Sequence, residues 1–154
     1  MQIRQATHED LPALMELWKE FMDHHRAQDP HYTRAPEGHL RWSEWLGKNL
    51  DNPDWRLLVA EEGARAVGYC LAFLNTCPPV ITSTRYGLVQ DMAVTRDRRG
   101  RGVGRRLYEA AEAWFRERGV DRVELDVAVS NPEAGAFWRR MGCRPFQERL
   151  VKRI

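Results

Sequence analysis

A glycine-rich turn between a predicted strand and a predicted helix constrains this chain more than any other stretch. Residues 88–94 are apolar enough for a buried strand, residues 103–118 have helical periodicity, and residues 99–104 between them are Arg-Gly-Arg-Gly-Val-Gly. Glycine tolerates positive φ angles and lets another molecule approach the backbone closely. Because a helix N-terminus also presents unpaired N–H groups, we interpret the turn as an anion site that holds the diphosphate of a cofactor.

Two other phosphate-binding turns fit these residues less well. A P-loop ends in Gly-Lys-Ser/Thr, whereas Gly104 is followed by Arg105 and Arg106. A dinucleotide fingerprint has the spacing Gly-x-Gly-x-x-Gly, whereas Gly100, Gly102 and Gly104 are evenly spaced. A tight turn inside a cluster of solvated arginines is the structural alternative. That cluster consists of Arg96, Arg98, Arg99, Arg101, Arg105 and Arg106.

Hydrophobic patterns along the rest of the chain predict an α/β fold with a mixed sheet. The predicted strands are residues 2–5, 55–61, 66–75, 88–94, 122–129 and 145–153. The first predicted helix begins at a capping box, Thr7–Asp10, and the others begin at Leu40, Val103 and Pro132. Strand 66–75 is apolar on both faces, which is typical of a central, covered strand. This order of elements indicates helices packed on both sides of one sheet.

Composition excludes several classes of protein. A chain of 154 residues favours one domain, residues 1–154, and no apolar run approaches the roughly 20 residues of a membrane span. The three cysteines form no Cys-x-x-Cys pair and no export signal opens the chain, so we expect a reducing cytoplasm. The five histidines all lie between His8 and His39, and their spacing predicts no metal site.

The glycine turn and two segments after it resemble the GNAT superfamily of acyl-CoA-dependent N-acyltransferases. The residues that carry the likeness are Arg-x-x-Gly-x-Gly at 99–104, the strand before it, Asn131, and Ala-Phe-Trp-x-x-x-Gly at 136–142. The resemblance implies a GNAT fold, in which a mixed, mostly antiparallel sheet opens into a V between its fourth and fifth strands. It also implies about four flanking helices and acetyl-CoA as cosubstrate.

The resemblance also implies which residues bind CoA. Backbone groups of Met92 and Val94 would hold the pantetheine arm, and an N–H near Met92 or Ala93 would stabilise the oxyanion formed when an amine attacks. Asn131 either contacts the arm or simply caps a helix. The full set of predicted CoA-binding residues is Met92, Ala93, Val94, Arg99, Gly100, Arg101, Gly102, Val103, Gly104, Arg105, Asn131 and Phe137.

The expected acid–base groups depart from the family pattern at two positions. Polyamine-type relatives carry Glu-Asp in this strand where the chain has Gln90 and Asp91, so Asp91 is our first candidate base and Tyr86 the second. A hydrogen-bonded strand residue is the plain alternative for Asp91. Many relatives place an acidic tyrosine where the chain has Trp138, whose indole N–H donates a hydrogen bond but not its proton. We expect Trp138 near the CoA sulfur, with water or Tyr86 as proton source.

These features predict an N-acetyltransferase that moves an acetyl group from acetyl-CoA to a primary amine by direct attack in a ternary complex. The acceptor, a small amine or a protein amine, would contact residues 20–40 and 76–86. The changes at Gln90 and Trp138 also allow a CoA-binding regulatory module with little turnover. A nucleic-acid-binding domain is a third hypothesis, which a net charge of +2 disfavours. Many relatives dimerise, so a homodimer is possible.

Overall fold

The fold is built around one five-stranded sheet with the strand order β1-β2-β3-β4-β5. A computed structural model of the protein describes residues 1–152 and 154. The strands are β1 (Gln2–Gln5), β2 (Trp55–Glu62), β3 (Arg65–Thr76), β4 (Arg85–Val94) and β5 (Val123–Leu125). Neighbours from β1 to β4 run antiparallel, and β5 joins β4 in parallel. The mixed sheet confirms the predicted fold class.

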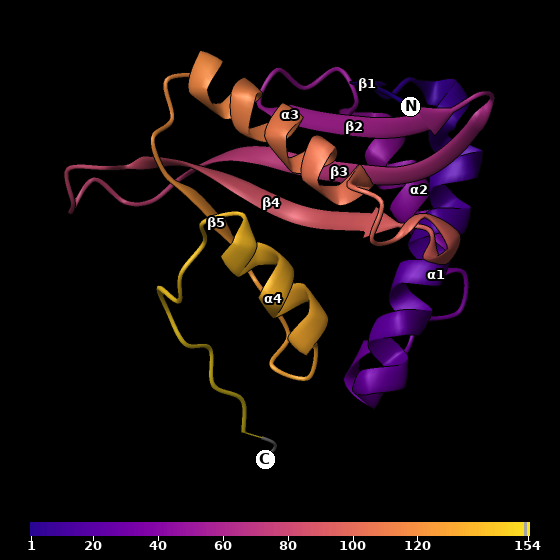
Figure 1. The fold of residues 1–154 in the computed structure, drawn as a ribbon. Helices are drawn as coiled ribbons and strands as arrows, with labels where there is room; N and C mark the ends of the chain where they lie inside the picture. The colour runs from indigo at the N-terminus through magenta and orange to yellow at the C-terminus, as the bar shows by residue number, and fades with distance from the viewer. Residues whose placement is uncertain (153) are drawn as a thin grey trace.

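Helices cover both faces of this sheet (Figure 1). They are α1 (Leu11–Gln28), α2 (Gly38–Asn49), α3 (Val103–Glu117) and α4 (Pro132–Arg140), with short 3-10 turns at His8–Asp10, Pro30–Tyr32 and Arg96–Arg98. Helices α1 and α2 pack on one face, and α3 and α4 pack on the other. Within the described residues, no helix has the length and apolarity needed to cross a bilayer.

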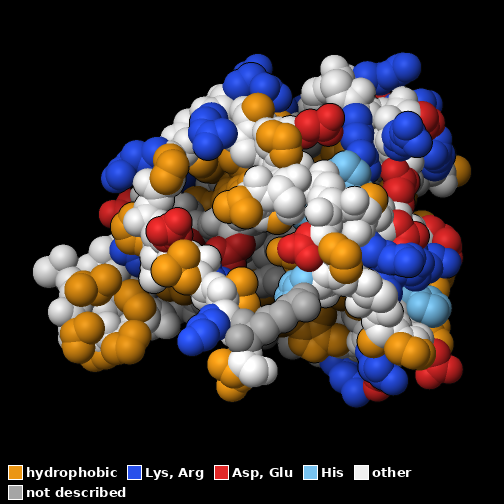
Figure 2. Space-filling model, turned by 90° about the horizontal axis from the view of Figure 1, so that it is seen from below, with side chains coloured by type: hydrophobic (Ala, Val, Ile, Leu, Met, Phe, Trp, Pro, Cys, Tyr) orange, Lys and Arg blue, Asp and Glu red, His pale blue; other side chains and the backbone are white. Residues whose placement is uncertain are grey.

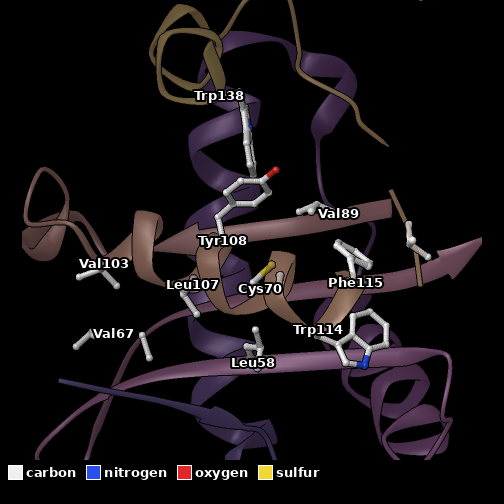
Figure 3. Close-up of a cluster of buried hydrophobic side chains, with 14 residues drawn as sticks. Leu58, Val67, Cys70, Val89, Val103, Leu107, Tyr108, Trp114, Phe115 and Trp138 are labelled. Carbon is white, nitrogen blue, oxygen red and sulfur yellow. The ribbon is translucent and has the colours of Figure 1, made fainter. Parts of the chain in front are cut away.

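Strand β3 lies at the centre of the molecule, as its two apolar faces predict. On one side, Tyr69 and Leu71 pack among side chains of α1 and α2 such as Trp42. On the other side, Val67 and Cys70 pack beneath α3, among the side chains drawn in Figure 3. Alternate residues of β3 therefore pack into two separate cores, one on each face of the sheet.

Close packing beneath α3 requires a glycine in β4. A Cβ at Gly87 would lie 2.6 Å from the buried ring of Phe115, closer than side-chain carbons approach. We expect Gly87→Ala to lower the free energy of unfolding by about 1–3 kcal/mol, because a filled core must shift to accept it. Urea denaturation measures the change. Gly38→Ala is the matched control, since its Cβ would lie at an ordinary 3.7 Å from Trp18, and a similar loss there would contradict the packing argument.

The last predicted strand is wrong, and the fifth is shorter than predicted. Residues 145–152 form no strand, and residue 153 lies outside the described residues. A sixth strand would need the free edge of β5 as its partner. Strand β5 spans only Val123–Leu125 rather than 122–129, which is too short to support another strand. The tail consequently leaves apolar side chains in solvent, with Leu150 83% exposed, and its Arg149 forms an exposed ion pair with Asp126.

Candidate functional site

The parallel ladder between β4 and β5 stops halfway along β4. It joins Gly87 to Val123, Leu88 to Glu124 and Val89 to Leu125, whereas β4 continues to Val94. Beyond this point, the edge of β4 that faces away from β3 has no ladder partner among the described residues. We call residues 90–94 along this edge the open edge of β4. It confirms the predicted opening of the sheet between the fourth and fifth strands.

A β-bulge at Gln90 decides which backbone groups face the open edge. Leu71 pairs with Asp91 and Ala72 pairs with Val89, so Gln90 is an extra residue on β4. Past the bulge, Ala93 pairs with Tyr69, and the N–H of Thr95 donates to the carbonyl of Val67 at 2.9 Å.

Backbone direction alternates along a strand, so the N–H and C=O groups of Met92 and Val94 point to the open edge. The Val94 carbonyl is reachable there, because Arg99 Nε donates to it at 3.0 Å. These are the two residues whose backbone groups the family resemblance assigns to the pantetheine arm.

The glycine turn lies at the end of this edge and opens towards solvent. Gly100 and Gly102 have φ angles of +72° and +80°, and a Cβ at either position would meet no atom within 4 Å. Gly102 caps α3 without a side-chain hydrogen bond, and the first intrahelical bond runs from Arg106 N to Gly102 O at 3.1 Å. The N–H groups of the first turn, residues 103–105, therefore have no helical acceptor, which is the arrangement that an anion site at this turn requires.

Ion pairs already engage three of the six surrounding arginines. Arg98 pairs with Glu62 at 2.8 Å, and Arg105 pairs with Glu109 at 2.7 Å. Arg99 reaches Glu20 at 3.5 Å. Arg101 is exposed and, like Arg96 and Arg106, forms no ion pair within residues 1–152 and 154, so an anionic ligand would break no ion pair to reach it.

Helix α4 approaches the turn through Phe137. A Cβ on Gly104 would lie 3.5 Å from the Phe137 ring and 3.6 Å from the end of Met92, so three predicted CoA-binding residues meet here. Asn131 is buried, and its side chain accepts a hydrogen bond from Ala134 N at 3.0 Å. Asn131 thus acts as the helix cap that was one of its two predicted roles.

The candidate acid–base residues lie in three separate places. Asp91 points to the α1 and α2 face, where burial raises the pKa of its carboxyl to about 6 and the indole of Trp42 partly opposes the shift. Tyr86 lies five residues earlier on β4, roughly 17 Å away along the strand, with Arg122 over its ring. The structure therefore does not bring Tyr86 to Asp91.

Trp138 is a core side chain in this structure. It is buried on the α3 and α4 face and meets the ring of Tyr108 edge-on, with 5.2 Å between ring centroids (Figure 3). Helical periodicity in α4 indicates such a buried position, but the contact with Tyr108 has no signal in the sequence.

Sequence reasoning missed Glu20, which fastens α1 to the start of the turn. Its carboxylate accepts from Thr95 Oγ1 at 3.0 Å and from Arg96 N at 2.7 Å. The two segments are 75 residues apart, so nothing local in the sequence connects them. The anchor matters because it fixes the backbone just before the predicted diphosphate site.

Apolar side chains gather beyond the other end of β4. Seen from below in Figure 2, orange side chains cluster at the end where the β3–β4 loop projects in Figure 1, and Val80 and Ile81 of that loop are exposed. This loop belongs to the predicted acceptor segment 76–86. Among residues 1–152 and 154, no group of three His, Cys, Asp or Glu side chains is arranged to hold a metal ion.

Comparisons with known proteins agree with this geometry. A mutant of the Bacillus halodurans protein BH1408 has a crystal structure that superposes with a TM-score of 0.91 at 25% identity, covering 100% of this chain and 99% of that one. The aminoglycoside N-acetyltransferase AAC(6')-Iy, solved in complex with CoA, has the same fold with a TM-score of 0.76 at 18% identity, covering 99% of this chain and 93% of that one.

A curated relative leads to the same family. An uncharacterised N-acetyltransferase of Methanocaldococcus jannaschii is 30% identical over 99% of this chain, although the chain spans only 66% of that relative's length. Residues 11–143 match the Acetyltransferase (GNAT) family, and that match includes the open edge of β4, the glycine turn and α4. The chain therefore belongs to the GNAT acetyltransferase family.

Proposed function

We propose that residues 1–154 form one N-acetyltransferase domain that moves an acetyl group from acetyl-CoA to a primary amine. The observation that carries the proposal is the position of the glycine turn at the end of the open edge of β4. Unpaired N–H groups at 103–105 suit a diphosphate, and the Met92 and Val94 backbone groups suit the amide-bearing arm attached to it. A family that transfers acetyl groups needs such a pair of sites side by side.

In this proposal the amine attacks the thioester directly, within a ternary complex. Asp91 accepts one proton from the ammonium group of the acceptor, directly or through water, which frees the lone pair for attack. The Met92 N–H donates to the thioester carbonyl oxygen as that oxygen gains negative charge. The carbon–sulfur bond then breaks, the thiolate leaves and takes up a proton, and the new amide loses one. A thiol has a pKa near 8.5, so the thiolate leaves without a strong acid.

The burial of Trp138 favours one alternative, a CoA-binding regulatory module with little turnover. An indole sits where many relatives have an acidic tyrosine, and it packs into the core. In that alternative the chain binds CoA but catalyses little or no acetyl transfer. Binding and turnover must therefore be measured separately.

Mass spectrometry of the purified protein for carried-over CoA, followed by CoA release with an amine panel, tests the proposal. The panel contains polyamines, amino acids, aminoglycosides and a lysine peptide. We expect a thermal shift with CoA and release above the hydrolysis background with at least one amine. CoA binding without release on any amine would favour the regulatory module, and absence of CoA binding would refute both.

A further inference from the structure

Two buried polar groups beside Asp91 have no hydrogen-bond partner in the described residues. Tyr69 is 0% exposed and its hydroxyl is unpaired, and Nε1 of the buried Trp42 is unpaired as well. Buried polar atoms are nearly always satisfied by protein or by an ordered water, because an unsatisfied one is costly. Two unpaired polar groups close together therefore indicate that a small polar molecule lies between them.

The two groups and Asp91 share one side of the sheet. Tyr69 pairs with Ala93 and Leu71 pairs with Asp91, so Tyr69 and Asp91 are diagonal neighbours on the face covered by α1 and α2. The ring centroids of Trp42 and Tyr69 are 5.5 Å apart. The indole of Trp42 also lowers the pKa of the Asp91 carboxyl, against the effect of burial. Asp91 is partly exposed whereas Tyr69 is not, so the cluster lies where the open edge of β4 meets the core.

We propose that the Tyr69 hydroxyl and the Trp42 indole N–H hold one buried water against the Asp91 carboxylate, and so position Asp91 as the proton acceptor. The water accepts one hydrogen bond from each of the two donors and donates one to Asp91, which gives it the roughly three bonds typical of buried waters. Its role in catalysis rests on the proposed function. Tyr69 and Trp42 are positioning residues, since neither touches a substrate.

A single proton is transferred in this step. The ammonium group of the acceptor gives its proton to the free carboxylate oxygen of Asp91, which yields a neutral amine and a neutral carboxyl, while the water keeps its protons. Burial raises the pKa of Tyr69, so its hydroxyl stays a protonated donor on the Asp91 side of the sheet, whereas Cys70 lies on the opposite face beneath α3. From α1, Glu20 accepts a hydrogen bond from Thr95, just after the end of β4, rather than contacting Asp91.

Carbon-13 NMR titration of Asp91 in the CoA-free protein tests the water site without relying on turnover. We expect Tyr69→Phe and Trp42→Phe each to raise the pKa of Asp91 by roughly one unit, because a donor chain that stabilises the charged form is lost. If the protein is an active acetyltransferase, kcat should fall about twofold at pH 7 and about tenfold at pH 5, at unchanged KM for acetyl-CoA, because the acid limb of the pH profile moves up by about one unit. Trp114→Phe, a buried indole beneath α3, is the control and should change neither value.

A cluster of Tyr69, Trp42 and Asp91 that holds no water would respond differently to these substitutions. If the Tyr69 hydroxyl is simply unsatisfied, Tyr69→Phe removes that cost, so the Tm rises and the pKa of Asp91 stays the same. That result, or a high-resolution crystal structure without a water between Tyr69 and Asp91, would overturn the proposal. Shifted pKa values in a protein that turns over no amine would instead keep the water site and refute the acetyltransferase function.

Discussion

Asp91→Asn is expected to lower kcat for acetyl transfer by about 10²–10⁴-fold, the usual contribution of a general base. The asparagine keeps the shape of the side chain but accepts no proton. The wild-type rate should fall as the pH drops below about 6, the pKa to which burial raises this carboxyl. Steady-state kinetics from pH 5 to 9 on an amine identified by the panel measures both effects. Asp54→Asn, an exposed carboxyl before β2, is the matched control and should retain full activity.

The same substitution should also make the protein more stable at neutral pH. The folded-state pKa of Asp91 is above its ordinary value, so the ionised carboxylate destabilises the native state above pH 6. Asp91→Asn removes that cost and should add about 1–2 kcal/mol at pH 7.5. The gain should vanish between pH 6 and 4, where the wild-type carboxyl is neutral too. A variant that is less stable at pH 7.5 but still active would identify Asp91 as a structural strand residue.

Gly102→Ala is expected to weaken CoA binding by about 10–100-fold, the equivalent of one to two lost hydrogen bonds to charged groups. The added methyl projects into the space above the N-terminus of α3, where the protein itself has no atom within 4 Å and where a diphosphate would approach. Isothermal titration calorimetry with CoA measures the change. The positive φ angle of +80° also costs roughly 1 kcal/mol of stability for a residue with a side chain.

Gly119→Ala separates these two effects. Gly119 follows the other end of α3 with a φ angle of +71° and open space around its Cβ position, so it carries the same backbone penalty far from the turn. The two variants should lose similar stability, and only Gly102→Ala should lose CoA affinity. Equal affinities would show that the turn is structural and that the arginine cluster around it is merely solvated.

Local periodicity was enough to predict the framework of the site. The strand at 88–94, the turn and the amphipathic helix after it follow from apolar spacing and from glycine, both of which act within a few residues. The family resemblance implies a role for the backbone of Met92 and Val94, and both residues direct their N–H and C=O groups to the open edge of β4. Helix α4 and its Asn131 cap were predictable for the same local reason.

The missed features all depend on contacts between distant segments. Trp42 and Tyr69 have the pattern of core residues, and nothing in that pattern reveals unpaired polar atoms beside Asp91. The short β5 and the unpaired tail at 145–152 could not be foreseen from a clean alternation, because a strand also needs a partner edge of sufficient length. Glu20 reaches the turn only after α1 has folded against the sheet.

The bulge at Gln90 changes the course of β4 without changing which residues of β3 and β4 face each other. The side chain of Gln90 is exposed, so exchanging it should matter little, and glutamate is not needed at that position. Deleting it would make the ladder with β3 regular, with Asp91 still opposite Leu71 and Ala93 still opposite Tyr69. The strand would lose the local bend and the extra twist of a bulge, at the point where β4 and β5 part. We therefore expect the deletion to alter the opening between these two strands while the Met92 and Val94 backbone groups remain directed towards it.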